Sequence, residues 1–215
     1  AERGEQLRRH ALYDAIDEQL RAQDGHRYWG WPVWPEQLRD PAGAGAAAFE
    51  AAHAEAVEFY AWLQWLADEQ LGAAQRLARE LGMAIGLYGD YAVGVNPSGA
   101  ETWSDQALYR KGAGVGAPPD ALALKGQDWG IPPQDPNVLV AEQYQPFRHL
   151  VAANMRHFGA LRLDHVMALF RQWWVPVGLG STEGGYVHYP VDDLMSVLAL
   201  ESERHNCLVV GEDLG

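Results

Sequence analysis

One arrangement occurs three times along this sequence: a helical segment, then a short apolar run, then a carboxylate. The apolar runs are residues 83–88, 160–163 and 207–211, and the carboxylates that follow them are Asp90, Asp164 and Glu212. Short apolar strands that alternate with helices are typical of a parallel sheet buried on both faces. The pattern therefore predicts an α/β fold in which helices cover a parallel sheet.

The carboxylates all follow the strands, and this position is informative. The carboxyl ends of parallel strands meet on one side of the sheet, and in a (β/α)8 TIM barrel that side carries the active site. A full barrel has eight strands and roughly 250 residues, whereas about three barrel strands are visible in these 215 residues, which also begin without Met. We therefore expect part of a (β/α)8 barrel with inserted helices and long loops, truncated at both ends.

The first 82 residues differ in pattern from the rest. Apolar residues at helical spacing over 5–22 and an Ala- and Glu-rich stretch over 46–81 predict helices. We expect residues 1–82 to form a mainly helical inserted region that packs on the barrel, and residues 83–215 to form the partial catalytic barrel. Further helices are expected at 147–158, 167–173 and 190–205. Residues 91–146 are rich in Gly and Pro and predict a long loop that includes the glycine-rich 112–116.

Charge and composition exclude several classes of function. Sixteen Lys and Arg against 29 Asp and Glu give a net charge of −13. Such a surface repels nucleic acid and anionic membranes, so neither is an expected partner. A single cysteine, Cys207, fits a reducing compartment, and no apolar run approaches the ~18 residues of a membrane span. We expect a soluble cytoplasmic protein, and the sequence leaves the oligomeric state open.

The carboxylates after the second and third apolar runs suggest acid and base chemistry. Residues two apart in a strand face the same side, so Arg162 and Asp164 should lie together, and a guanidinium favours the ionised carboxylate that a nucleophile requires. Glu212 ends an apolar strand, and apolar surroundings favour the protonated form that a general acid requires. The combination is typical of a retaining glycosidase. A structural salt bridge for Asp164 and a helix N-cap neighbourhood for Glu212 remain alternatives on the residues alone.

Metal and cofactor chemistry find less support. Three carboxylates at strand ends could bind Mg²⁺ for enolate chemistry, but the only lysines, Lys111 and Lys125, lie in the long loop, and Arg162 would repel a cation. The eight histidines include no pair at helical ligand spacing. The segment 112–116 lacks the third glycine of a dinucleotide fingerprint, because Ala117 takes its place. We expect no cofactor and no metal.

Several long motifs resemble a known family. They are LRLDHVM at 161–167, GYVHYPVDDL at 185–194, LALES at 198–202, VGEDLG at 210–215, IGLYGDYAVG at 85–94 and GAPPDALALKGQDWGIPP at 116–133. Their sequences and their order are similar to those of bacterial 4-alpha-glucanotransferases, also called amylomaltases or disproportionating enzymes. The resemblance extends from about residue 7 to residue 215.

This resemblance implies a (β/α)8 barrel and a retaining transfer of alpha-1,4-glucan segments between maltooligosaccharides through a covalent glucosyl-Asp intermediate. It implies that Asp164 is the nucleophile, Glu212 the general acid and base, and Arg162 the support of the nucleophile. It further implies substrate-binding roles for Asp90, Asp120, Gln127, Trp129 and His165. Partners would be maltooligosaccharides and other alpha-1,4-glucans.

The chain departs from the family pattern in one respect that concerns activity. The family's third catalytic carboxylate belongs to a His-Asp motif expected beyond Glu212, and a region expected before Ala1 is absent. We therefore expect the 215-residue chain alone to be inactive. Two alternatives remain: an alpha-glucan hydrolase of related mechanism, and a non-catalytic sugar-binding fragment.

Overall fold

The computed structural model describes residues 2–213, with side chains from residue 4 onward, and these residues form two compact units. Unit 1 contains the described residues up to Gln70 together with Asn96–Gln106, and unit 2 contains Leu71–Val95 and the described residues from Ala107 onward. The long helix α3 (Ala54–Glu80) contributes to both units. No helix among residues 2–213 combines the length and the apolar character needed to cross a membrane.

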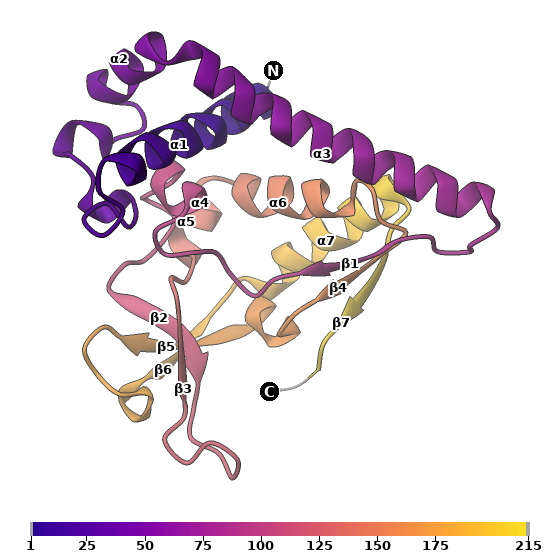
Figure 1. Cartoon of the computed structure of the whole chain (residues 1–215). Coiled ribbons are helices and arrows are strands. Elements are labelled where there is room, and N and C mark those ends of the chain that lie inside the picture. Colours follow the sequence, from indigo (N-terminus) through magenta and orange to yellow (C-terminus); the bar gives the residue numbers. More distant parts are fainter. Residues whose placement is uncertain (1, 214–215) are drawn as a thin grey trace. The chain divides into compact units, whose positions relative to one another are not determined.

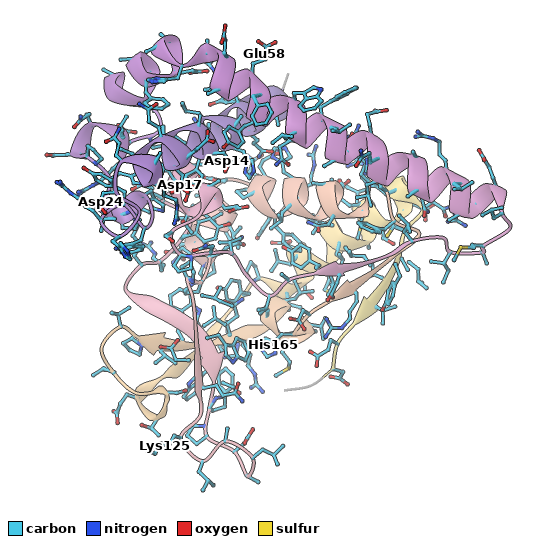
Figure 2. All side chains as sticks on the ribbon, viewed as in Figure 1. Asp14, Asp17, Asp24, Glu58, Lys125 and His165 are labelled. Atoms are coloured by element: carbon cyan, nitrogen blue, oxygen red, sulfur yellow. The ribbon has the colours of Figure 1, made fainter. Side chains whose placement is uncertain are left out.

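Unit 1 is helical (Figure 1). Its elements are α1 (Glu2–Asp24), the short 3-10 helices η1 (Trp31–Val33) and η2 (Glu36–Leu38), α2 (Ala44–Ala52), the first part of α3, and α4 (Ala100–Ser104). The helices expected at 5–22 and 46–81 are confirmed, with a short break between α2 and α3 at His53. In Figure 2, Asp14, Asp17 and Asp24 lie along α1, and Glu58 lies on α3.

Three aromatic side chains from three segments hold unit 1 together. The ring of Tyr13 lies 5.0 Å from that of Trp34 and 5.9 Å from that of Trp103. Both tryptophans are fully buried, and the indole N–H of Trp103 donates to the backbone oxygen of Leu38 at 3.0 Å. Because buried aromatic rings dominate the energetics of small cores, this cluster fixes α1 and α4 to the segment between them.

Unit 2 contains the parallel sheet that the sequence predicts. The strands β1 (Tyr88–Tyr91), β4 (Ala160–Leu163) and β7 (Leu208–Gly211) pair in the order β1-β4-β7, and both pairings are parallel. Helices α6 (Gln145–Met155) and α7 (Val191–His205) lie along one face of this sheet (Figure 1). Buried Met155, Leu161 and Leu198 form part of the shared core. This mixed α/β architecture is part of a (β/α)8 barrel.

A second sheet in unit 2 was not expected from the sequence. It is antiparallel and pairs in the order β3-β2-β5-β6, formed by β2 (Ala113–Ala117), β3 (Gln127–Ile131), β5 (Arg171–Pro176) and β6 (Gly185–His188). Three shorter helices complete the unit: α5 (Pro136–Ala141), η3 (Val166–Leu169) and η4 (Ser181–Glu183).

This sheet corrects two expectations. The glycine-rich 112–116 is not a loop, because most of it forms β2, and the helix expected at 167–173 is instead η3 followed by β5. The glycines are explained by close packing, since a Cβ at Gly116 would overlap the backbone oxygen of Gln127 on β3. Pairing with strands distant in the sequence therefore overrides the local signal in both segments.

Asp135 provides a pH-dependent contribution to the stability of unit 2. It is 4% exposed, caps α5 by accepting the backbone N–H of Asn137 at 2.7 Å, and pairs with Arg110. Burial alone would raise the pKa of Asp135, but the hydrogen bonds from Asn137 and Arg110 outweigh it and lower that pKa below its usual range. A lowered folded-state pKa stabilises the fold above the unfolded-state pKa of about 3.9, and this contribution disappears as the pH falls through the folded-state value.

We expect Asp135→Asn, which keeps a capping side chain but loses the charge, to lower the free energy of unfolding at pH 7. The expected loss is about 1–2 kcal/mol, since a hydrogen-bonded charge is replaced but the Arg110 side chain is half exposed to solvent. Thermal denaturation at pH 7 and at pH 3 measures the difference, which should shrink at the lower pH. The exposed Asp192→Asn is the control, and an equal loss at both pH values would contradict the role of the charge.

Candidate active site

The register of the parallel sheet brings the candidate residues to one end of three adjacent strands. Asp90 on β1 pairs with Arg162 on β4, which in turn pairs with Val210 on β7. Asp164 and Glu212 are the first residues after β4 and β7. The three carboxylates therefore lie at the carboxyl ends of neighbouring strands, as the sequence predicts, although Asp90 belongs to β1 itself.

Arg162 connects two of these carboxylates. One terminal nitrogen, Nη1, donates to Oδ1 of Asp90 at 2.7 Å, and the other, Nη2, donates to Oδ1 of Asp164 at 2.8 Å. The hydrogen bond to Asp90, together with the negative charges of Asp90 and Asp164, raises the pKa of the Arg162 guanidinium above its usual value. The expected neighbourhood of Arg162 and Asp164 is confirmed. Two carboxylates thus share one cation.

Glu212 is held by the turn that follows β4. Its backbone N–H donates to the oxygen of Leu163 at 2.9 Å, and its backbone oxygen accepts the N–H of Val166 at 3.1 Å. Its side-chain Oε2 accepts the backbone N–H of His165 at 3.0 Å. The backbone of the turn from Asp164 to Val166 therefore contacts both the backbone and the carboxylate of Glu212.

The hairpin formed by β2 and β3 brings further residues that the sequence predicts. The rings of Trp129 and His165 meet edge to face, with centroids 5.1 Å apart, and the indole N–H of Trp129 donates to Oε1 of Gln127 at 2.9 Å. Figure 2 shows Lys125 at the tip of this hairpin and His165 beside the end of the parallel sheet. Asp120 lies near the tip, where its carboxylate accepts the backbone N–H groups of Leu122 and Ala123. Asp120 thus shapes the hairpin, whereas Trp129 reaches the other candidate residues.

A cavity of about 260 Å³ adjoins Asp90 and includes residues that the sequence reasoning missed. Tyr91, Gln172 and Tyr189 line it, and Tyr189 is buried, with its hydroxyl 2.6 Å from the backbone oxygen of Gln134 and 2.8 Å from Oε1 of Gln172. Burial raises the pKa of both Tyr91 and Tyr189, so both phenols are neutral at physiological pH. Tyr91 could have been found from the sequence because it follows Asp90. Gln172 and Tyr189 are distant from Asp90 in the sequence, and the folding of the second sheet brings them to the cavity.

Three parallel strands covered by helices form part of a (β/α)8 barrel, and their carboxylates lie at the carboxyl ends of the strands, where such barrels carry their chemistry. Among the side chains of residues 4–213, no group of three or more His, Cys, Asp or Glu is placed to bind one metal ion. The chain belongs to the 4-alpha-glucanotransferase family, glycoside hydrolase family 77, whose family model matches residues 1–215.

Individual relatives agree with this family. The chain is 46% identical to a 4-alpha-glucanotransferase of Haemophilus influenzae over 215 residues, which are 99% of this chain and 31% of that protein. It is 48% identical over 185 residues to the 4-alpha-glucanotransferase of Mycobacterium bovis, covering 86% of this chain and 26% of that protein. The chain therefore spans about a third or less of the length of these relatives.

Two solved structures have a similar fold. The amylomaltase of Corynebacterium glutamicum superposes with a TM-score of 0.80 at 38% identity, covering 97% of this chain and 27% of that one. An amylomaltase of Streptococcus agalactiae, determined in complex with acarbose, gives a TM-score of 0.83 at 18% identity, covering all of this chain and 43% of that one.

Proposed function

We propose that the full-length protein containing this chain is a 4-alpha-glucanotransferase that moves alpha-1,4-glucan segments between maltooligosaccharides with retention of configuration. The observation that carries the proposal is the shared guanidinium: Arg162 holds Asp164 through one nitrogen and Asp90 through the other. Glu212 follows the adjacent parallel strand. An ionised Asp and a carboxylic acid on neighbouring strands are the groups that a retaining double displacement needs.

In the first step, a carboxylate oxygen of Asp164 attacks C1 of the donor sugar. The bond between C1 and the glycosidic oxygen breaks, and Glu212 gives its proton to that leaving oxygen. The products are a glucosyl ester of Asp164 and a shortened glucan with a free 4-hydroxyl group. Arg162 orients Asp164 through the hydrogen bond from Nη2 to Oδ1.

In the second step, the 4-hydroxyl oxygen of an acceptor sugar attacks C1 of the glucosyl ester. Its proton passes to the carboxylate of Glu212, and the bond between C1 and Asp164 breaks, which restores both side chains. Each displacement inverts C1, so the two together retain the alpha configuration. In this proposal Asp90 contacts the donor sugar, and His165 supports the site.

Transfer requires the sugar hydroxyl to react faster than water. A positioned group has an effective molarity of roughly 10⁵ M or more, so a bound acceptor can prevail over water at about 55 M. The β2–β3 hairpin supplies Gln127 and Trp129 as an acceptor platform, and Trp129 already contacts His165 beside Asp164. We assign Asp120 to the same acceptor path through the hairpin tip that it shapes.

The test is incubation of the full-length protein with maltotriose alone, with products separated by chain length. Glucose together with a ladder of longer maltooligosaccharides is the expected result. Shorter sugars only would indicate a hydrolase, and binding without any turnover would indicate a sugar-binding protein. The same assay applied to the 215-residue chain tests our expectation that it is inactive alone.

We expect Trp129→Ala to increase hydrolysis relative to transfer, because the acceptor loses an aromatic surface worth about 0.5–1.5 kcal/mol beyond its buried area. The corresponding change is about 2- to 10-fold in the ratio of free reducing ends to ladder products. Trp65→Ala, which removes an exposed tryptophan of α3, is the matched control. An unchanged ratio in the Trp129 variant would remove the hairpin from the acceptor path.

A further inference from the structure

His165, which follows Asp164 and donates its backbone N–H to Glu212, has an unusual backbone conformation. Its φ of 50° and ψ of 61° are left-handed, and only three other residues among the described non-glycine positions have a positive φ. Left-handed backbone is uncommon for a residue with a side chain, although His is among the residues enriched there. Conformations of this kind persist where the surroundings enforce them, often at functional sites.

The left-handed turn directs three consecutive groups to their partners. The N–H of Asp164 donates to the backbone oxygen of Tyr91, on the β1 side of β4, at 3.0 Å. The N–H of Val166 donates to the backbone oxygen of Glu212, on the β7 side, at 3.1 Å. Between them, the N–H of His165 donates to Oε2 of Glu212. The chain therefore changes sides at His165. Its φ sets the orientation of its own N–H relative to that of Val166, so a different φ would prevent both groups from donating to Glu212 at once.

The side chain of His165 is held from a second direction. The ring of Trp129 meets it edge to face, and the indole N–H of Trp129 is itself held by Gln127. The loop end of the two paired strands is fixed by Ser181, whose hydroxyl lies 2.7 Å from the backbone oxygen of Ala117 and 3.0 Å from that of Gln127. The hairpin thus has a defined position at the point where it contacts His165.

We propose that His165 is a positioning residue for Glu212: its backbone N–H holds Oε2, which leaves Oε1 to carry the transferred proton, and Trp129 secures His165 from the hairpin. The inference rests on the proposed function and gives the two oxygens of Glu212 different roles: Oε2 fixes the side chain and Oε1 transfers the proton. It also connects the proposed acceptor platform to the acid and base, because Trp129 of that platform contacts His165, and His165 holds Glu212.

The test compares two donors that differ in their need for an acid. Maltotriose needs a proton on its leaving oxygen, whereas α-maltosyl fluoride releases fluoride without one. We compare His165→Val, whose β-branched side chain disfavours left-handed backbone, with His165→Asn, which tolerates it. We expect the Val variant to lose about 10²-fold in kcat/KM for maltotriose, the lower end of what a general acid contributes, and only about 3-fold for the fluoride. The Asn variant should lose less than about 10-fold for maltotriose.

Controls separate this effect from a general loss of structure. His188→Val makes the same substitution at an exposed position of β6 and should change both rates by less than about 2-fold. If His165→Val does not fold, Trp129→Ala and Trp129→Phe replace it. In that case, we expect Trp129→Ala to lose more kcat/KM for maltotriose than for the fluoride. Trp129→Phe should show a smaller difference between the two losses.

Equal losses on the two donors, or an Asn variant as impaired as the Val variant, would overturn the positioning role. These outcomes are distinct from a failure of the proposed function. If the natural protein released neither glucose from maltotriose nor fluoride from the activated donor, the function itself would be wrong. If the natural protein is active and the ratio of the two rates does not move, only the role of His165 is wrong.

Discussion

Replacing Asp164 by Ala in the full-length protein is expected to reduce kcat/KM for maltotriose by about 10⁴-fold or more, the scale on which removal of a covalent nucleophile acts. The structure gives the reason. Asp164 directly follows β4, and Nη2 of Arg162 donates to its Oδ1 at 2.8 Å. In the proposed mechanism no glucosyl ester forms without that carboxylate, while Arg162 keeps its other partner, Asp90. The initial rate of glucose release measures the effect.

The stereochemistry of rescue distinguishes a nucleophile from a supporting carboxylate. With α-maltosyl fluoride as donor and azide as external nucleophile, the Asp164→Ala variant should form β-maltosyl azide, because a single displacement inverts C1. Asp164→Asn keeps the size of the side chain and should be equally inactive without azide. The exposed Asp192→Ala on α7 is the control and should retain activity within about 2-fold. An α-azide product from Asp164→Ala would show that the covalent intermediate forms on another residue.

The sequence predicted those parts of the site that depend on local order. Alternation along a strand was enough to place Arg162 beside Asp164, and the bounds of β4 match the predicted apolar run. The first strand was displaced: β1 begins at Tyr88 rather than at residue 83. The preceding backbone is held by side chains of α3, because Gln75 accepts the N–H of Leu87 at 2.7 Å and Arg79 donates to the oxygen of Ala84. Such contacts compete with strand pairing and have no periodic signature.

The parts that could not be predicted depend on pairing across long stretches of sequence. The segment Ala113–Ala117 becomes a strand because Arg171–Pro176 and Gln127–Ile131 pair with its two edges. Its glycines resemble a loop in sequence, although close strand packing requires at least Gly116. The contact between Trp129 and His165 follows from this sheet. The positive φ of His165 lets the N–H groups of His165 and Val166 both donate to Glu212. Neither feature has a pattern in the sequence.

Replacing Glu212 by Ala should give a different kinetic signature from the Asp164 variant. The rate on maltotriose should fall about 10²- to 10⁴-fold, because both the protonation of the leaving oxygen and the deprotonation of the acceptor are lost. With α-maltosyl fluoride the first step needs no acid, so the glucosyl ester on Asp164 should form and accumulate. A burst of one fluoride per protein molecule, followed by slow release, is the expected time course.

Azide should then restore turnover of the Glu212→Ala variant, since an anion needs no base to attack the glucosyl ester. The product should be α-maltosyl azide, because two inversions retain the configuration. Glu203→Ala, at an exposed position of α7, is the matched control. If the Glu212 variant gave no fluoride burst, and its first turnover slowed as much on the fluoride as on maltotriose, Glu212 would act in binding rather than in proton transfer. The opposite configurations of the two azide products thus assign Asp164 and Glu212 independently of the size of either rate loss.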